Sequence, residues 1–230
     1  MLQVQGLNQY YGGSHILRDV SLQAKVGEVT VVLGRNGVGK TTLLKSLMGV
    51  VPTRTGTIRL DDKDLAGKAP YERVRSGVGY VPQGREIFGR LTVMDNLRMG
   101  LASMPSGSDV PAEMFELFPV LAQMKNRRGG DLSGGQQQQL AIARALVTEP
   151  KVLLLDEPTE GIQPSIIKDI AKALNEIRKL REITIVVSEQ VLSFAMDVAD
   201  RLFVIEGGRL VHETSRADTD VTRIKQYLSV

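Results

Sequence analysis

The strongest pattern in the chain is a set of short, unbroken apolar runs. They cover residues 29–33, 78–81, 152–155 and 183–187 and are rich in valine, isoleucine and leucine. Strands that are buried on both faces, as in a parallel sheet covered by helices, have this composition rather than an alternating one. The runs therefore predict a central, mostly parallel sheet.

Between these runs the apolar spacing becomes helical. A helix is predicted over residues 41–49, and another begins near Pro164. The apolar side of this second helix consists of Ile166, Ile170, Leu174 and Ile177. Strands that alternate with helices indicate an α/β fold. At the two ends, residues 2–22 alternate between apolar and polar positions, and 202–211 predict a hairpin around Gly207-Gly208.

Residues 85–135 differ in character from the rest of the chain. Spacings of three and four predict helices over 92–101 and 112–124, separated by an exposed loop at 103–108. We therefore expect a single unit, 1–230, with a helical subdomain inserted at 85–135.

Composition mainly excludes classes of protein. Of the 230 residues, 42% are hydrophobic and 24% charged, which argues against wholesale disorder. Zero cysteines exclude disulfides and thiolate chemistry. A net charge of 29 − 26 = +3 is too small to indicate a nucleic-acid partner. No run approaches the roughly 20 apolar residues of a membrane span, and we expect no signal peptide.

A glycine-rich turn follows the first apolar run and fits the pattern G-x-x-x-x-G-K-[ST]. It consists of Gly34, Arg35, Asn36, Gly37, Val38, Gly39, Lys40 and Thr41. Glycines let backbone N–H groups surround a phosphate chain, and the next helix adds its positive dipole end. We expect Lys40 to reach the β- and γ-phosphates, Thr41 to ligate Mg²⁺, and Thr42 to donate to a phosphate. The strand before the turn and the helix after it disfavour a chance match.

Two acids, Asp156 and Glu157, follow the run at 152–155. Ligands of parallel sheets bind at the carboxyl ends of the strands. We expect Asp156 to hold Mg²⁺ and Glu157 to polarise a water for attack on the γ-phosphate. A solvated acidic turn is the alternative, which the phosphate loop upstream disfavours.

These motifs, together with the pentapeptide 132–136, resemble the ATP-binding cassette family, whose signature is Leu-Ser-Gly-Gly-Gln. The resemblance covers essentially the whole chain. It implies a P-loop NTPase with a RecA-like core, a mostly parallel sheet, an N-terminal antiparallel β subdomain and an inserted α-helical subdomain. It also implies ATP and Mg²⁺ as cofactors.

The resemblance assigns further roles by position. Tyr11 lies where the family stacks an aromatic side chain on adenine, with Tyr10 as a close alternative. Gln83 resembles the hinge glutamine that touches Mg²⁺ and the attacking water. The residues that would cap the γ-phosphate of ATP bound to a partner subunit are Ser133, Gly135 and Gln136. A head-to-tail dimer with ATP between the subunits is therefore implied.

Two positions depart from the family pattern. Gln190 stands where a histidine usually contacts the γ-phosphate, and Gln163 replaces the usual aspartate after the acid pair. Glutamine can still donate and accept hydrogen bonds, but it carries no proton charge. His15 and His212 are expected on the surface and are not replacements.

A single cassette without a span is similar to bacterial importer subunits. In detail it resembles the branched-chain amino acid group and, within that group, the urea-uptake version, on residues 7–17, 34–42, 80–88, 128–139 and 159–164. This implies a dimer with itself or a paralogous ATPase, two membrane permease subunits, a periplasmic solute-binding protein, and a cytoplasmic position on the inner face of the membrane. A permease would dock around 83–97 through Ile87, Phe88 and Leu91, which could instead be subdomain core.

Three other functions remain open at this point. The first is an importer of branched-chain amino acids or of other amides. The second is a cytosolic cassette acting on nucleic acid, which the single cassette and the absence of charge blocks disfavour. The third is a P-loop kinase, which would need no signature motif.

Overall fold

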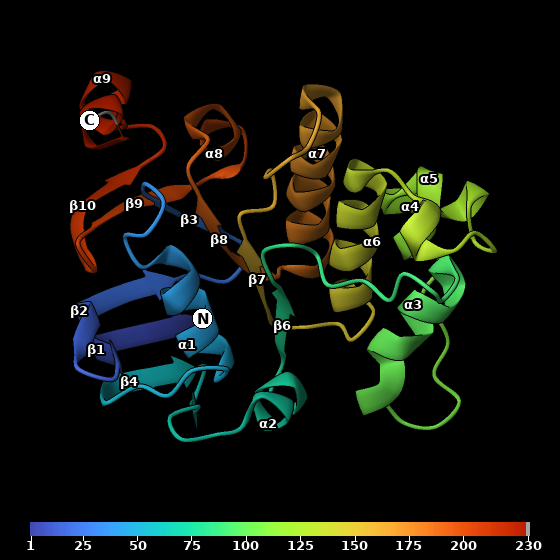
Figure 1. Ribbon diagram of the computed structural model, residues 1–230, viewed down its shortest axis with the longest axis horizontal. Helices are drawn as coiled ribbons and strands as arrows, with labels where there is room; N and C mark the ends of the chain where they lie inside the picture. Colours follow the sequence, from blue (N-terminus) through green and yellow to red (C-terminus); the bar gives the residue numbers. More distant parts are fainter. Residues whose placement is uncertain (229–230) are drawn as a thin grey trace.

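Two sheets lie at the centre of the computed structural model, which describes residues 1–228 (Figure 1). The larger sheet has the strand order β10-β9-β3-β8-β7-β6, and all neighbours except β9 and β10 pair in parallel. Its strands are β3 (Val29–Leu33), β6 (Val78–Val81), β7 (Val152–Asp156), β8 (Thr184–Glu189), β9 (Arg201–Glu206) and β10 (Arg209–Ser215). The predicted α/β fold with a mostly parallel sheet is confirmed.

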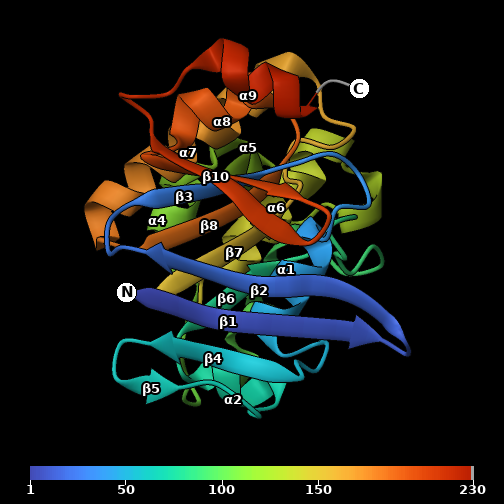
Figure 2. The same cartoon turned by 90° about the vertical axis from the view of Figure 1, so that its left-hand side faces the viewer.

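The smaller sheet is antiparallel and has the order β2-β1-β4-β5 (Figure 2). Its strands are β1 (Leu2–Tyr11), β2 (Ser14–Ala24), β4 (Thr55–Leu60) and β5 (Lys63–Asp64). β4 and β5 were not predicted, and neither were α2 (Pro70–Arg75), α8 (Leu192–Val198) and α9 (Val221–Leu228).

The apolar runs are buried on both faces because alternate residues enter different cores. Val31 and Leu33 of β3 join one core, whereas Val32 joins the other. The first core contains the apolar sides of α6 (Gly134–Leu146), α7 (Pro164–Arg181) and α8. The second core places α1 (Lys40–Met48) between the parallel and antiparallel sheets.

Only helices and loops lie between β6 and β7 in the chain, and Figure 1 shows α3, α4 and α5 on the far side of α6 from the sheets. These elements are α3 (Val93–Gly100), η1 (Leu101–Ser103), α4 (Glu113–Leu117), α5 (Pro119–Gln123) and η2 (Gly129–Asp131). The predicted single helix over 112–124 is wrong. Phe118 has a non-helical φ of −129°, because the following Pro119 disfavours helical geometry in its predecessor. The subdomain boundaries 85–135 stay a prediction.

Within residues 1–228, no helix is both long enough and apolar enough to cross a membrane.

Candidate functional site

The phosphate loop connects β3 to α1. Gly37 and Gly39 have φ of 80° and 112°, a conformation that favours glycine. A Cβ on Gly34 would lie 2.8 Å from side-chain atoms of Ile205 and Val38, so the loop has no room for one. The first turn of α1 has no side-chain cap, which leaves backbone N–H groups for an anion.

Lys40 is the central cation of this loop, and its side chain is only 3% exposed. Its Nζ donates to the carbonyl oxygens of Gly34 and Arg35, both at 2.8 Å. The same Nζ lies 2.9 Å from Oε1 of Glu157, which is also buried. The loop and the acid pair therefore meet at one ammonium group.

The acid pair lies at the carboxyl end of β7. Asp156 Oδ1 accepts hydrogen bonds from Thr41 Oγ1 at 3.2 Å and from Ser188 Oγ at 2.6 Å. Burial raises the pKa of Asp156, and the hydrogen bonds from Ser188 and Thr41 oppose this shift. Glu157 has a left-handed φ of 46°, and its backbone N–H donates to the Ser188 carbonyl at 3.0 Å.

One oxygen on each acid, Asp156 Oδ2 and Glu157 Oε2, is buried without a hydrogen-bond partner. A buried carboxylate oxygen without a partner is costly unless a ligand satisfies it. The hydroxyl of Thr41 and the carboxylate of Asp156 are ligands suited to Mg²⁺, which usually takes one or two carboxylates and completes its shell with phosphates. Within residues 1–228, no group of three or more acids, histidines or cysteines is arranged so that it could hold a metal ion.

The next strand contributes residues that the sequence did not single out. Ser188 bridges the two acids, because its Oγ also accepts from the backbone N–H of Glu157 at 3.2 Å. Glu189 is buried; it accepts from the Thr159 hydroxyl at 2.8 Å and from the backbone N–H groups of Gln190 and Val191. Burial raises the pKa of Glu189. The sequence did contain a signal for these two residues, because Ser188 and Glu189 are polar yet directly continue the buried, valine-rich run of β8.

Gln190 itself is exposed, and the structure gives its side chain no hydrogen-bond partner within residues 1–228. Gln83 is also exposed and donates from Nε2 to Glu160 Oε2 at 3.0 Å. It thus reaches the loop that follows the acid pair. Gln163 is the N-cap residue of α7 and makes no side-chain cap.

The signature residues are used within their own helix. Ser133 is the N-cap of α6: its Oγ accepts from the Gln136 N–H, and Gln136 Oε1 accepts from the Ser133 N–H at 2.9 Å. This reciprocal pair is a capping box. In the described chain no hydrogen bond or ion pair joins residues 133–136 to the phosphate loop. The structure therefore does not bring the two predicted half-sites together within one chain.

The two candidates for stacking on adenine, Tyr11 and Tyr10, differ in whether their rings already make contacts within the chain. Tyr11 is 48% exposed at the end of β1. Tyr10 stacks on His15 at 4.1 Å between ring centroids, and the Arg54 guanidinium lies 5.1 Å above the Tyr10 ring. Because those ring contacts are already made, Tyr11 is the better candidate. His15 and His212 are only partly exposed, and His212 stacks on Tyr227.

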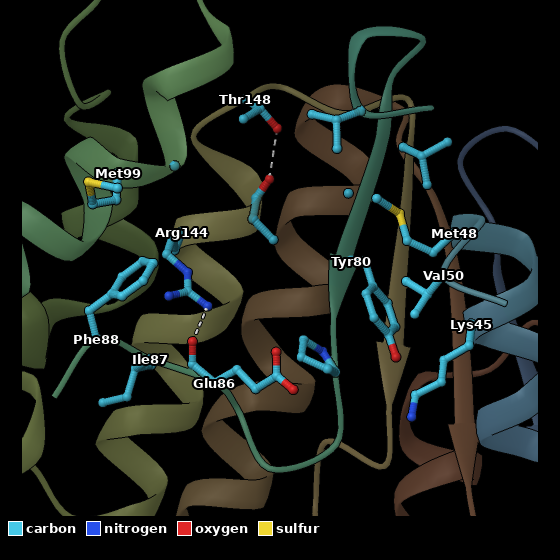
Figure 3. A pocket seen from close by; sticks show the side chains of 16 residues that line it. Lys45, Met48, Val50, Tyr80, Glu86, Ile87, Phe88, Met99, Arg144 and Thr148 are labelled. Carbon is cyan, nitrogen blue, oxygen red and sulfur yellow. Dashed lines mark hydrogen bonds between the residues drawn. The ribbon is translucent and has the colours of Figure 1, made fainter. Parts of the chain in front are cut away.

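A groove of about 770 Å³ opens beside this site, between β6 and the helices α1, α3 and α6 (Figure 3). Exposed apolar side chains line it, including Val50, Phe88 and Met99. Ile87 and Phe88, predicted to contact a permease, line the groove, whereas Leu91 does not.

Comparison with known proteins consistently finds ATP-binding subunits of transport systems. The family model described as ABC transporter matches residues 17–160. The high-affinity branched-chain amino acid transport ATP-binding protein BraG of Pseudomonas aeruginosa is 41% identical and covers 94% of each chain. The probable branched-chain amino acid transport ATP-binding protein LivF of Archaeoglobus fulgidus is 34% identical over 91% of this chain and 90% of its own. The lipopolysaccharide export ATP-binding protein LptB of Escherichia coli is also 34% identical, over 91% and 88%.

Solved structures share the fold. A nucleotide-free ATP-binding cassette from an ABC transporter superimposes with a TM-score of 0.81 at 29% identity, covering all of this chain and 95% of its own. A dimeric cassette bound to ADP and phosphate in a post-hydrolysis state has a TM-score of 0.84, covering 94% of this chain and 99% of its own. At 24% identity, the second match supports the fold alone.

Proposed function

Because the chain belongs to the ABC transporter family, we propose that it is the ATP-hydrolysing subunit of an importer for branched-chain amino acids. Cassettes of this family bind ATP and hydrolyse it to drive transport. The observation that carries the proposal is the meeting of Lys40, Thr41, Asp156 and Glu157 at the carboxyl edge of the parallel sheet.

The residues have separable tasks in hydrolysis. The loop N–H groups and Lys40 bind the phosphates and oppose the negative charge that develops during transfer. Glu157, held by Lys40 and by the backbone of β8, is the group that accepts a proton from the attacking water. Gln83 and Gln190 flank this region and would orient the water and the γ-phosphate.

A bound Mg²⁺ would be held by Thr41 and Asp156, with Gln83 as a further oxygen ligand, and would neutralise charge on the phosphates. Ser188 fixes Asp156 in the orientation required, because it donates to the same oxygen that accepts from Thr41.

The cargo is proposed from the relatives rather than from this chain's own residues. Two relatives named for branched-chain amino acid transport match more than nine-tenths of the chain. These comparisons do not support the prediction of urea, and the amino acid alternative fits better. The partners proposed are a second cassette, two permease subunits in the membrane, and a solute-binding protein on the opposite face.

The separation of the signature from the phosphate loop within one chain supports a head-to-tail dimer. In that dimer the helix N-terminus of α6 would face the γ-phosphate of the partner's ATP. Docking to the permease through the groove would place the chain on the cytoplasmic face of the membrane.

Uptake measurements test the proposal. Cells of the source organism that lack this chain should lose most high-affinity uptake of labelled leucine and keep uptake of labelled urea. Wild-type chain should restore leucine uptake, whereas Glu157→Gln should not, because it lacks the proton acceptor. Loss of urea uptake alone, or restoration by Glu157→Gln, would contradict the proposal.

A further inference from the structure

The turn that follows Gln83 has an unusual backbone. Gly84, Arg85 and Glu86 have φ of 82°, 70° and 45°, so three consecutive residues are left-handed. Two of them carry side chains, for which this conformation is unfavourable. Unfavourable backbone geometry persists where the surroundings impose it, and such positions cluster at functional sites.

Arg144 of α6 holds the backbone of this turn. Its Nη2 donates to the carbonyl oxygen of Glu86 at 2.8 Å, which Figure 3 shows, and to that of Arg85 at 3.4 Å. Ile87 and Phe88 come next in the chain and line the docking groove. The turn is therefore continuous with the groove surface.

The side chain of Arg85 makes contacts on two other segments. Its Nη2 donates to the carbonyl oxygen of Glu160 at 3.2 Å, in the loop after the acid pair. Its Nη1 donates to Gln137 Oε1 at 3.4 Å, in the first turn of the signature helix. Gly134 leaves room for this guanidinium: a Cβ there would lie only 3.1 Å from Nη1, whereas one on Gly161 would make an ordinary contact 3.6 Å from Nη2.

We propose that Arg85 is a positioning residue that ties the signature helix and the Glu160 loop to the docking groove within one subunit. A guanidinium carries several donors in a rigid plane, so it can bridge two acceptors at a fixed angle. A change in the groove that moves the turn then moves both segments together. The proposal rests on the proposed function, since it gives the groove a path to the site of hydrolysis.

Stability alone does not explain an arginine here. The hydrogen bond to Gln137, at 3.4 Å, is longer than an ordinary N–H···O bond, and the one to Glu160, at 3.2 Å, is at the upper end of the normal range. Glycine would be better suited to a φ of 70°. The residue therefore has a poor conformational fit and comparatively long hydrogen bonds, but it joins three segments.

The test compares Arg85→Gly and Arg85→Lys with the control Arg98→Ala in the purified full chain. Arg98 is a 62% exposed arginine of α3 whose ion pair with Asp95 is surface-exposed. We expect both Arg85 variants to lower kcat about 10- to 100-fold, the scale of a misplaced catalytic group, with ATP affinity unchanged. The control should keep both values. Arg85→Gly should also keep the thermal midpoint of the wild type, because glycine relieves the backbone.

A second measurement separates this proposal from the proposed function. Glu157→Gln alone should form an ATP-bound dimer in gel filtration; failure to do so, with hydrolysis intact, would overturn the proposed function whatever Arg85 does. When that variant dimerises, adding Arg85→Gly should raise the ATP concentration for half-dimerisation about 10-fold. Unchanged kcat and dimerisation would overturn the role of Arg85. Full activity of Arg85→Lys would also overturn it, because a point charge would then suffice.

Discussion

At the scale of single residues, the site concentrates buried charge. Lys40, Asp156, Glu157 and Glu189 are all buried near the ends of β7 and β8. Each has partners, yet Asp156 and Glu157 each keep one unpaired oxygen. Incomplete pairing of buried charge costs stability, and proteins tolerate that cost where a ligand later completes the pairing.

Replacing Asp156 with asparagine should stabilise the chain when ATP and Mg²⁺ are absent. Burial raises the pKa of this carboxyl in the folded chain, so the folded state binds the proton more tightly than the unfolded state. Stability therefore falls as pH rises from the unfolded pKa to the folded one, and it stays reduced above that interval. The gain from Asp156→Asn should thus be larger at about pH 7 than at about pH 4.

Denaturant unfolding at both pH values measures this difference. Asp61→Asn is a control of opposite sign, because hydrogen bonds from the N-terminal amine and Lys151 lower the pKa of Asp61. It should lose a little stability at neutral pH and less in acid, and the loss should be small at a surface position. Equal stability of Asp156→Asn and the wild type at pH 7, measured without ATP and Mg²⁺, would contradict the role of burial.

A ligand measurement complements the pH comparison. Adding ATP and Mg²⁺ at about 100 times Kd should stabilise the wild type by about 3 kcal/mol and Asp156→Asn by much less.

At the scale of elements, the signature helix has a structural requirement besides its predicted phosphate contact. Gly135 lies where α6 meets α7, and a Cβ there would lie 2.7 Å from Cγ2 of Ile166. The glycine therefore permits close packing of the two helices, and it follows directly after the capping residue Ser133 and Gly134. Ser133 thus caps the helix start, and Gly135 two residues later sets the distance between the two helices.

Gly135→Ala should destabilise the chain by about 1–3 kcal/mol, because the added methyl overpacks the contact with Ile166. Gly13→Ala is the matched control: nothing lies within 4 Å of its added Cβ, and its φ is not left-handed. Urea unfolding of both variants checks the prediction. A Gly135→Ala midpoint equal to that of Gly13→Ala would show that α7 moves away freely.

At the scale of the whole molecule, one short segment, residues 83–88, connects the groove with the loop that follows the acid pair. Gln83 reaches Glu160, whereas Ile87 and Phe88 face the groove. The exposed apolar side chains gathered there are typical of a surface that another protein covers. The proposed docking surface and the proposed site of hydrolysis are thus connected by neighbouring residues.

Met99→Glu should weaken binding to the permease at least about 10-fold, because an interface would bury an unpaired carboxylate. Met99 is 47% exposed in the groove; Val211→Glu is the control, since Val211 is 42% exposed on β10, away from the groove. Co-purification from membranes with each tagged variant measures the effect. Equal recovery of membrane partners with both variants would place the docking surface elsewhere.

Several features of the fold and site could be predicted because their signals are local. The runs that became β3, β7 and β8 and the phosphate loop at 34–41 are each contiguous in the sequence. The single helix predicted over 112–124 failed because its apolar spacing continued through Pro119. β4 and α2 were missed because their patterns are short.

The sequence by itself determined where the phosphate loop and the acid pair lie in the fold, since backbone preference and strand–loop–helix order act between near neighbours. Only the tertiary structure decided that Ser188 joins the two acids, that Arg85 joins Glu160 to Gln137, and which tyrosine stays available. Such contacts link residues tens of positions apart, so they depend on strand order and helix packing, which no local pattern encodes.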